Sequence, residues 1–307
     1  MPHADIAPAE IARPPLAPSL RKNRLLGIGL MVTAATGFSL AGVLVRQTET
    51  TAWEVVFWRS VFMVLVVATV LFLQHRLKAF AVIRAVGWIG LVSAFFLASS
   101  FYCFVLAIKH TTVANTVVIM SAAPFVTALA GWMVLGERVP PRTWIALVAA
   151  ATGIALMFWE SLATGTGLLG NVFAFGIAIT YAGQVTPLRM AGANLDMAPT
   201  ALLAGLMASA IGLPLAWPFS ASAHDVGVFA VMGVFQIGLP NVLMIRAARY
   251  LSATEIVLLG MVEVVLGPIW VWLAIAERPS DLALIGGAIV LAALAGNALA
   301  GSRRGAA

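Results

Sequence analysis

Ten long apolar stretches, each carrying few charged residues, follow one another along the chain. Because about 20 residues at a rise of 1.5 Å cross a hydrocarbon core of about 30 Å, stretches of this length predict membrane-spanning helices. The predicted spans are residues 25–45, 53–73, 84–107, 112–135, 142–159, 168–189, 200–217, 226–247, 253–275 and 281–300. The connectors between them are short. The pattern therefore predicts an all-α integral membrane protein without a sizeable soluble domain.

A stretch of the first half recurs, loosely, in the second. Ala107–Glu137 and Ala247–Glu277 both open with alanine, one further residue, a basic residue and an aromatic residue, then pass a threonine or serine and run apolar to a closing Glu-Arg. With the following arginine the copies read AIKHTTVANTVVIMSAAPFVTALAGWMVLGER and AARYLSATEIVLLGMVEVVLGPIWVWLAIAER. The hydropathy follows the same shift, with five spans before the midpoint and five after it.

Five is an odd number, so the second copy enters the membrane from the side opposite the first. The sequence thus predicts two inverted five-helix repeats. Such repeats give a protein two nearly equivalent conformations, each open to one side, with the substrate site near the midplane. The expected function is therefore secondary transport of a small molecule by alternating access.

Composition excludes a soluble globular protein. The chain is 62% hydrophobic and 10% charged with a mean hydropathy of +1.01, whereas soluble domains are about 45–50% apolar and about 25% charged. The net charge of +6 does not indicate nucleic-acid binding, because the basic residues are spread over many segments instead of forming one patch.

Lysine and arginine placement predicts the orientation. If the N-terminus is cytoplasmic, the outer side holds only Arg46, Lys109 and Arg278, with Arg59 inside a helix. The inner side then holds Arg13, Arg21, Lys22, Arg24, Arg76, Lys78, Arg84, Arg138, Arg142, Arg189, Arg246, Arg249, Arg303 and Arg304. This positive-inside bias predicts a multi-pass protein of the cytoplasmic (inner) membrane with both termini in the cytoplasm.

The expected organisation follows from the spans. Residues 1–24 are rich in alanine and proline with a basic end, which is typical of a disordered cytoplasmic tail. The first repeat is expected at 25–160, a linker at 161–167, the second repeat at 168–300 and a basic cytoplasmic tail at 301–307.

The chain resembles the EamA type of the drug/metabolite transporter superfamily. The resemblance rests on the ten-helix pattern in two halves, the Gly-Glu-Arg of Gly136–Arg138 with its echo Ala276–Arg278, and the segment Glu54–Arg59 at the start of the second helix. It implies that the first four helices of each half enclose a central cavity, and that the protein is an exporter. The family's Glu-Pro pair in the ninth helix departs here to Glu263-Val264, with the proline at Pro268.

Charged residues at membrane depth are the first candidates for the site, because a charge at a helix centre costs on the order of 2.5–3.5 kcal/mol and must face protein or water. Glu263 lies near the middle of the ninth span and is expected to carry protons or pair with a cationic substrate. Arg59 in the second span would anchor an anion, pair with a glutamate, or snorkel to the interface. Glu255 would line the same inner vestibule, or serve only its own helix dipole.

Neutral polar residues within the spans form a second set of candidates. They would donate or accept hydrogen bonds to substrate, or join helices to one another with modest energies of about 0.6–2 kcal/mol each. They are Tyr102, Asn115, Asn171, Tyr181, Gln184, Gln236 and Asn241.

Gate and hinge candidates come from matching places in the two halves. Pro124 and Pro268 interrupt the fourth and ninth spans and would act as hinges or simple kinks. Lys109 and Arg249 stand at the tips of the third and eighth spans and would act as gates or as ordinary helix-end cations.

Other functions are disfavoured. An enzyme would need a nucleophile, a metal cluster or an acid/base pair, and the four histidines lie far apart in tails and loops. A receptor would normally carry an output domain. Gly165, Gly167 and Gly170 match G-x-G-x-x-G but follow a helix instead of a strand, so no cofactor or metal is expected.

The transport hypothesis leaves several points open. The substrate is expected to be a small metabolite or amino-acid-like compound, exported by proton coupling or exchange through Glu263, with a nucleotide-sugar or purine carrier as the alternative. The partners are this substrate, the lipid bilayer and protons, with no nucleic acid. A face of small residues on the tenth span fits either a monomer or a homodimer.

Overall fold

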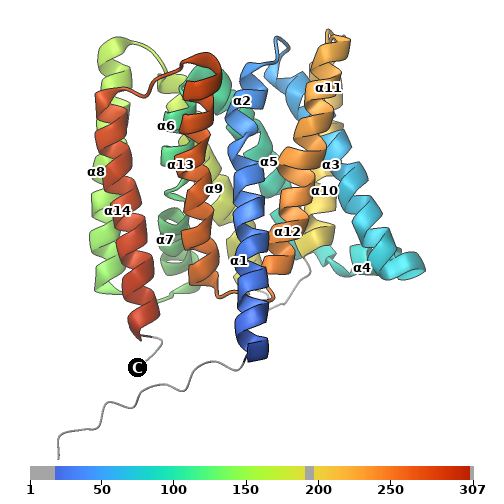
Figure 1. Ribbon diagram of the computed structural model, residues 1–307, viewed down its shortest axis with the longest axis horizontal. Coiled ribbons are helices and arrows are strands. Elements are labelled where there is room, and N and C mark those ends of the chain that lie inside the picture. The colour runs from blue at the N-terminus through green and yellow to red at the C-terminus, as the bar shows by residue number, and fades with distance from the viewer. Residues whose placement is uncertain (1–17, 191–196, 305–307) are drawn as a thin grey trace, which may run out of the picture.

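A computed structural model describes residues 18–190 and 197–304 (Figure 1). All regular secondary structure within these ranges is helical, and ten helices are long and apolar enough to cross a membrane. The predicted all-α fold with ten spans is confirmed.

Three of the ten spans are built from consecutive shorter helices. The first span is α1 with α2, the fourth is α6 with α7, and the eighth is α11, η2 and α12. The elements are α1 Pro18–Ser39, α2 Ala41–Arg46, α3 Ala52–His75, η1 Arg76–Lys78, α4 Ala79–Ala85, α5 Gly87–His110, α6 Val113–Met120, α7 Ala123–Leu135, α8 Pro141–Thr164, α9 Leu168–Met190, α10 Met197–Ala216, α11 Ala223–Val231, η2 Met232–Gly238, α12 Leu239–Ala247, α13 Ala253–Ile275 and α14 Asp281–Arg304.

The interruptions have local causes. Pro124 lies in the first turn of α7, where a residue without an N–H is tolerated, and the chain turns at Ser121 and Ala122 just before it. The segment η2 is a π-helix that ends immediately before α12, whose first turn contains Pro240. By contrast, α13 runs unbroken through Pro268.

Several predicted boundaries differ from the structure, among them both ends of the third span, which is Gly87–His110 instead of 84–107. The third span does not begin at residue 84, because α4 ends at Ala85 and Gly87 has a positive φ of +62°, a conformation that favours glycine. The fifth span continues beyond residue 159 to Thr164. The connection that follows it is therefore short, and Gly165 and Gly167 supply its left-handed turns with φ of +67° and +78°.

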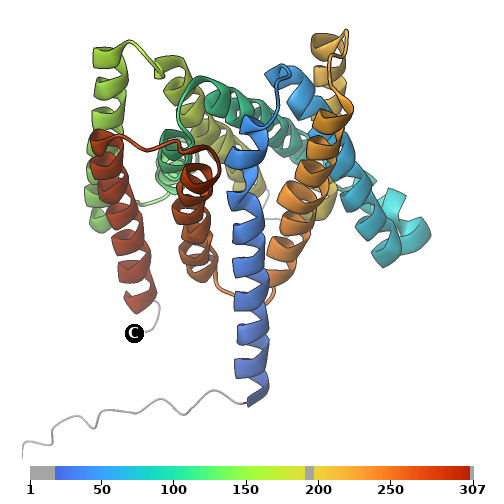
Figure 2. The same ribbon diagram turned by 45° about the horizontal axis from the view of Figure 1, so that its top comes forward.

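The helices pack as two groups with a separate pair at one edge. We call α1, α2, α12 and α13 the α1/α13 group, because α1 packs against both α12 and α13. We call α5, α6, α7 and α9 the α5/α9 group, because α9 packs against the other three. Helices α8 and α14 pack on each other at the edge of the bundle (Figures 1 and 2), and α3 packs on α10 and η2.

The pair α8 and α14 depends on glycine at its crossing. A Cβ added at Gly286 would meet the carbonyl oxygen of Gly153 at 2.6 Å, whereas one added at Gly296 would meet nothing within 4 Å. We expect Gly286→Ala to lower the Tm of the detergent-solubilised protein through an overpacking cost of about 1–3 kcal/mol. Gly296→Ala, the matched control in the same helix, should leave the Tm unchanged or raise it. Equal Tm values for the two variants would contradict this description of the crossing.

Candidate functional site

The two ends of the bundle carry different polar contacts. We call the end where α1 begins and α14 finishes the terminal face, at the bottom of Figure 1. The opposite end, with the α2–α3 and α8–α9 connections, is the distal face. The polar contacts at these two faces differ in whether they join the α1/α13 group to the α5/α9 group.

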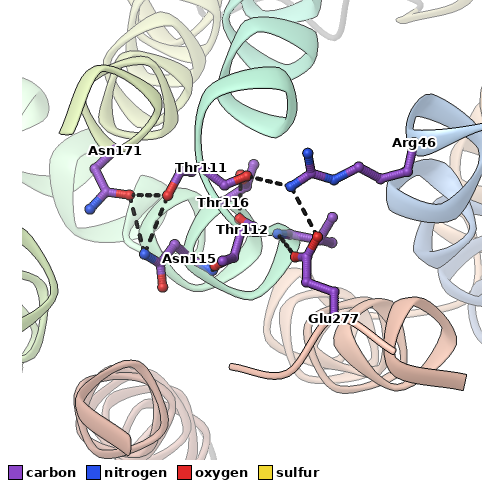
Figure 3. Close-up of polar contacts among 8 residues, drawn as sticks. Arg46, Thr111, Thr112, Asn115, Thr116, Asn171 and Glu277 are labelled. Atoms are coloured by element: carbon purple, nitrogen blue, oxygen red, sulfur yellow. Dashed lines mark hydrogen bonds and ion pairs between the residues drawn. The ribbon is translucent and has the colours of Figure 1, made fainter. Parts of the chain in front are cut away.

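A network of charge-assisted hydrogen bonds joins the two groups at the distal face (Figure 3). Arg46 at the end of α2 donates from Nη2 to the Thr111 carbonyl oxygen at 2.8 Å and pairs with Glu277 at 3.0 Å. The second oxygen of Glu277 accepts the backbone N–H of Val113, the first residue of α6, at 2.8 Å. Lys109 donates to the Thr48 carbonyl oxygen at 2.7 Å. We call these six residues the distal latch.

The latch continues into a buried amide cluster that includes two predicted candidates, Asn115 and Asn171. Thr111 donates to Asn171 Oδ1 at 2.8 Å, and Asn171 donates to Ser161 Oγ at 2.8 Å. Asn115 donates to Thr111 Oγ1 at 3.3 Å, while its own Oδ1 is buried and has no hydrogen-bond partner within residues 18–190 and 197–304 (Figure 3). Asn115 therefore retains one acceptor for a further donor.

Left-handed residues position the two Glu-Arg turns. Ala276 ends α13 with φ +56°, and Gly136 ends α7 with φ +66°. This turn sends the next residue, Glu277 or Glu137, back along the bundle. Alanine in this conformation costs about 1–2 kcal/mol, so the contacts of Glu277 must offset strain that glycine avoids at Gly136.

At the terminal face, two further ion pairs stay within the groups. Arg189 of α9 pairs with Glu137 at 3.1 Å inside the α5/α9 group, and Arg24 of α1 pairs with Glu255 of α13 at 2.7 Å inside the α1/α13 group. The Arg189 and Glu137 side chains are 46% and 47% exposed, against 27% and 20% for Arg46 and Glu277. The Arg189–Glu137 pair at the terminal face is thus more exposed to solvent than the Arg46–Glu277 pair at the distal face.

A polar cavity of about 430 Å³ lies beside the latch at the distal face. Its lining includes the cations Arg46, Lys109 and Arg278 and the carboxylate Glu160. Glu160 accepts a hydrogen bond from Ser280, and Arg278 lies over the Trp272 ring. Because the cations outnumber the carboxylate in this lining, the cavity carries a net positive charge.

Glu263 occupies the face of α13 that meets α1. It lies three residues after Gly260 and four before Gly267, a spacing that puts all three on one side of the helix. A Cβ added at Gly260 would approach Met31 of α1 at 3.7 Å, whereas one added at Gly267 would approach Val117 of α6 at 3.7 Å and the Ser39 carbonyl oxygen of α1 at 3.8 Å, so this face of α13 borders α6 as well as α1. The Glu263 carboxylate is partly buried and makes no hydrogen bond or ion pair with the part of the chain that the structure describes.

Arg59 is almost fully buried in α3, with 2% of its surface exposed. Its guanidinium lies over the rings of Phe101 and Phe104, 5.3 Å and 6.0 Å from their centroids. The atoms Nε and Nη2 are buried and have no hydrogen-bond partner among the described residues.

The candidates Tyr102, Gln184 and Tyr181 differ in their burial and in their contacts with other spans. Tyr102 donates to the Ala208 carbonyl oxygen of α10 at 2.6 Å, a bond that joins two spans. Gln184 is buried in α9. Tyr181 is 44% exposed and follows Val172 by nine residues, about half a turn around the helix from that exposed apolar side chain. Tyr181 therefore faces away from the side of α9 that Val172 presents.

The remaining polar candidates are held by their own helices. Gln236 is buried in the π-helix η2 with Oε1 unpartnered. Asn241 donates to the Ile237 carbonyl oxygen at 2.7 Å, four residues earlier in the same span. Glu255 closes a capping box with Ser252 at the start of α13 in addition to its pair with Arg24.

The gate and hinge candidates differ in their surroundings. Lys109 is part of the distal latch, whereas Arg249 is exposed at the turn between α12 and α13. Pro124 sits beside an actual break in its span, and Pro268 lines an apolar groove of about 730 Å³ between α13 and α14.

Sequence reasoning missed the partnership of Arg46 with Glu277. The signal was present in the echo of Gly136–Arg138 by Ala276–Arg278, which marks the same turn twice. It also missed Glu54, which is 1% exposed and accepts hydrogen bonds from the backbone of Ser220 and Ala221.

Comparison with known proteins now fixes the family. A model of the EamA-like transporter family matches residues 25–159 and 168–299. The chain belongs to this family. The resemblance predicted from the Glu-Arg turns and the span pattern is confirmed, and the EamA-like chain is a multi-pass membrane transporter.

Individual relatives are more distant. The EamA-like chain is 27% identical over 279 residues to the pseudopaline exporter CntI of Pseudomonas aeruginosa, in strains UCBPP-PA14 and PAO1, over 87% of this chain and 94% of that protein. It is 27% identical over 120 residues to the uncharacterized transporter YwfM of Bacillus subtilis, over 39% and 40% of the two chains. A solved structure described only as a crystal structure of a protein superposes with a TM-score of 0.61 at 16% identity, covering 93% of this chain and 99% of the other.

Proposed function

We propose that this EamA-like protein exports a small, amino-acid-like metabolite across the cytoplasmic membrane by alternating access. In this proposal the terminal face is cytoplasmic, in agreement with the excess of lysine and arginine there. The distal latch is the closed outer gate, so the structure is the state that loads substrate from inside. The similarity to CntI, an exporter, supports the direction.

The observation that carries this proposal is where the two groups touch. Contacts between the α1/α13 and α5/α9 groups are made by α2 against α5 and by α6 against α13. Both α2 and α6 are the distal halves of their spans. The latch bonds from Arg46, Lys109 and Glu277 cross between the groups at the same end. The described ion pairs at the terminal face stay within each group, which leaves the groups free to separate there.

Glu263 is the proposed coupling carboxylate. It faces α1 from the middle of α13 without a partner among the described residues, so protonation of its carboxyl would not break an existing contact. An ionised carboxylate at that depth is costly unless it is paired or hydrated. A proton or a cationic group of the substrate would remove that cost, and the two could exchange at this site.

Flux through proteoliposomes with an imposed pH gradient tests the coupling. Amino acids, nucleosides, nucleotide sugars and cationic drugs are screened with the wild type, with Glu263→Gln, and with Glu49→Gln, which alters an exposed glutamate of the α2–α3 connection. We expect Glu263→Gln to lose the gradient-driven flux while keeping exchange, and Glu49→Gln to behave as wild type. Gradient-driven flux that is unaltered in Glu263→Gln would remove Glu263 from the coupling step. Absence of flux for every compound would count against the transport proposal itself.

A further inference from the structure

Arg59 presents an unusual electrostatic problem inside the bundle. It lies in the second turn of α3 with only 2% of the residue exposed, and its buried Nε and Nη2 atoms have no hydrogen-bond partner in the part of the chain that the structure describes. A buried charge is normally paired, because the desolvation penalty of an unpaired ion amounts to several kcal/mol. The described part of the chain does not supply the expected counter-charge.

The carboxylate nearest in sequence is already committed elsewhere. Glu54 precedes Arg59 by five residues, about 140° around the helix. Its two oxygens accept from the backbone N–H groups of Ser220 and Ala221 at 2.8–3.2 Å and from the Ser220 hydroxyl at 2.9 Å. Glu54 therefore serves the α10–α11 connection and leaves the guanidinium without an anion.

The surroundings of Arg59 favour a planar anionic ligand. The rings of Phe101 and Phe104 flank the guanidinium carbon at 5.3 Å and 6.0 Å, which stabilises the cation through the ring faces. They make no hydrogen bond to it, so its N–H groups remain available. A guanidinium offers parallel N–H donors that match the two oxygens of a carboxylate.

The neighbouring segment η2 carries a second unsatisfied group. It packs against α3 so closely that a Cβ at Gly233 would meet the Arg59 carbonyl oxygen at 2.6 Å. Within the same π-helix, the Oε1 atom of Gln236 is buried and has no hydrogen-bond partner among the described residues. Short π-helical segments often occur at functional sites. The backbone of Arg59 thus lies against a segment that carries a second unsatisfied polar group, while its guanidinium extends toward Phe101 and Phe104 of α5.

We propose that Arg59 binds a carboxylate of the transported compound, which makes carboxylate-bearing solutes the substrate class. The inference rests on the proposed transport function and specifies its site. It names the group that selects substrate, whereas Glu263 is proposed for coupling.

Ligand-dependent thermal stability of the purified full-length protein tests the assignment. The probes are pairs that differ only in the carboxylate: L-phenylalanine and L-phenylalaninamide, L-histidine and L-histidinamide, succinate and succinamide. A ligand that binds only the folded state stabilises it by RT ln(1 + [L]/Kd), so the dependence of the Tm on probe concentration gives a Kd for each probe. The variants are Arg59→Met, Arg59→Lys and the exposed-cation control Arg249→Met.

We expect at least one carboxylate probe to raise the wild-type Tm more than its amide partner does. In Arg59→Met its Kd should rise by roughly tenfold or more, because a bidentate charge-assisted pair is lost. Arg59→Lys should give an intermediate Kd, since a lysine keeps the charge but lacks the fork, and Arg249→Met should match the wild type. Without ligand, Arg59→Met should have the same Tm as wild type or a higher one.

Three results would overturn the assignment. They are equal effects of carboxylate and amide in every pair, an unchanged Kd for the carboxylate probe in Arg59→Met, and a clearly lower ligand-free Tm in Arg59→Met, which would show that the guanidinium already has a structural partner. Flux of amides or other compounds without a carboxylate, at wild-type rates in Arg59→Met, would retain the transporter and reject this site. Failure of all flux is a separate result that concerns the proposed function.

Discussion

Glu277→Gln is expected to open the distal face, and Glu137→Gln is expected to close it further. Glu277 holds Arg46 and the first N–H of α6 at that face, and hydrogen bonds to charged groups contribute about 1.5–3 kcal/mol each. Because 1.4 kcal/mol is a factor of ten in an equilibrium, losing the charge should shift the populations of the two conformations by roughly ten- to a hundredfold. In the sequence repeat, Glu137 of the first half matches Glu277 of the second. Loss of the Glu137 charge should therefore disfavour the conformation that is open at the distal face.

The distance between spin labels across the distal face measures this shift. Labels at Gln47 and Leu169, both exposed and on opposite groups, are introduced in a Cys103→Ala background, since Cys103 is the single cysteine. We expect the long-distance population to grow in Glu277→Gln and to shrink in Glu137→Gln relative to wild type. Glu49→Gln, beside the same label, serves as the control for a nearby charge loss.

If the long-distance population shifted in the same direction in Glu277→Gln and Glu137→Gln, the two glutamates would not stabilise opposite conformations. In that case the two Glu-Arg turns would stabilise the fold without selecting between conformations. An unchanged distance distribution in Glu277→Gln would show that Lys109 with Thr48, or helix packing at α2 and α6, holds the distal face closed. Either result could be obtained without knowing the substrate.

Glu54→Ala is expected to be the most destabilising single substitution considered for this chain. The carboxylate is 1% exposed and satisfies the N–H groups of Ser220 and Ala221 together with the Ser220 hydroxyl. Alanine would remove these hydrogen bonds to a charged group, which contribute about 1.5–3 kcal/mol each. Ser220 is exposed and Ala221 is half-buried, so water replaces part of the lost bonding and we expect a total loss of roughly 2–4 kcal/mol.

Thermal unfolding of the detergent-solubilised variants checks this expectation. Glu54→Ala should lower the Tm by far more than Glu49→Ala, whose glutamate is exposed in the connection just before α3. Glu54→Gln should fall between them, because an amide keeps one acceptor but brings N–H groups toward other donors. A Tm for Glu54→Ala equal to that of Glu49→Ala would mean that water replaces the carboxylate at the α10–α11 connection.

The sequence by itself determined the fold class, the ten spans and the resemblance to the family. These properties follow from local hydropathy and from a repeated turn, and neither depends on which helices touch. The position of Glu263 near the centre of a span was determined in the same way. Span ends were predicted less closely: the third span is shifted to Gly87–His110 and the fifth extends to Thr164, because hydropathy does not register where a positive φ interrupts a helix or how far a hydrogen-bond ladder continues.

Only the tertiary structure decided which polar residues are committed and which are free. Glu54 and Ser220 lie 166 positions apart, and Val113 and Glu277 lie 164 apart, so no local pattern links them. Arg59 and Glu54 look alike in sequence, as charges in one span, yet packing satisfies the carboxylate and leaves the guanidinium unpaired. The physical reason is that a side chain's hydrogen-bond partners come from helices that meet only after the bundle has assembled.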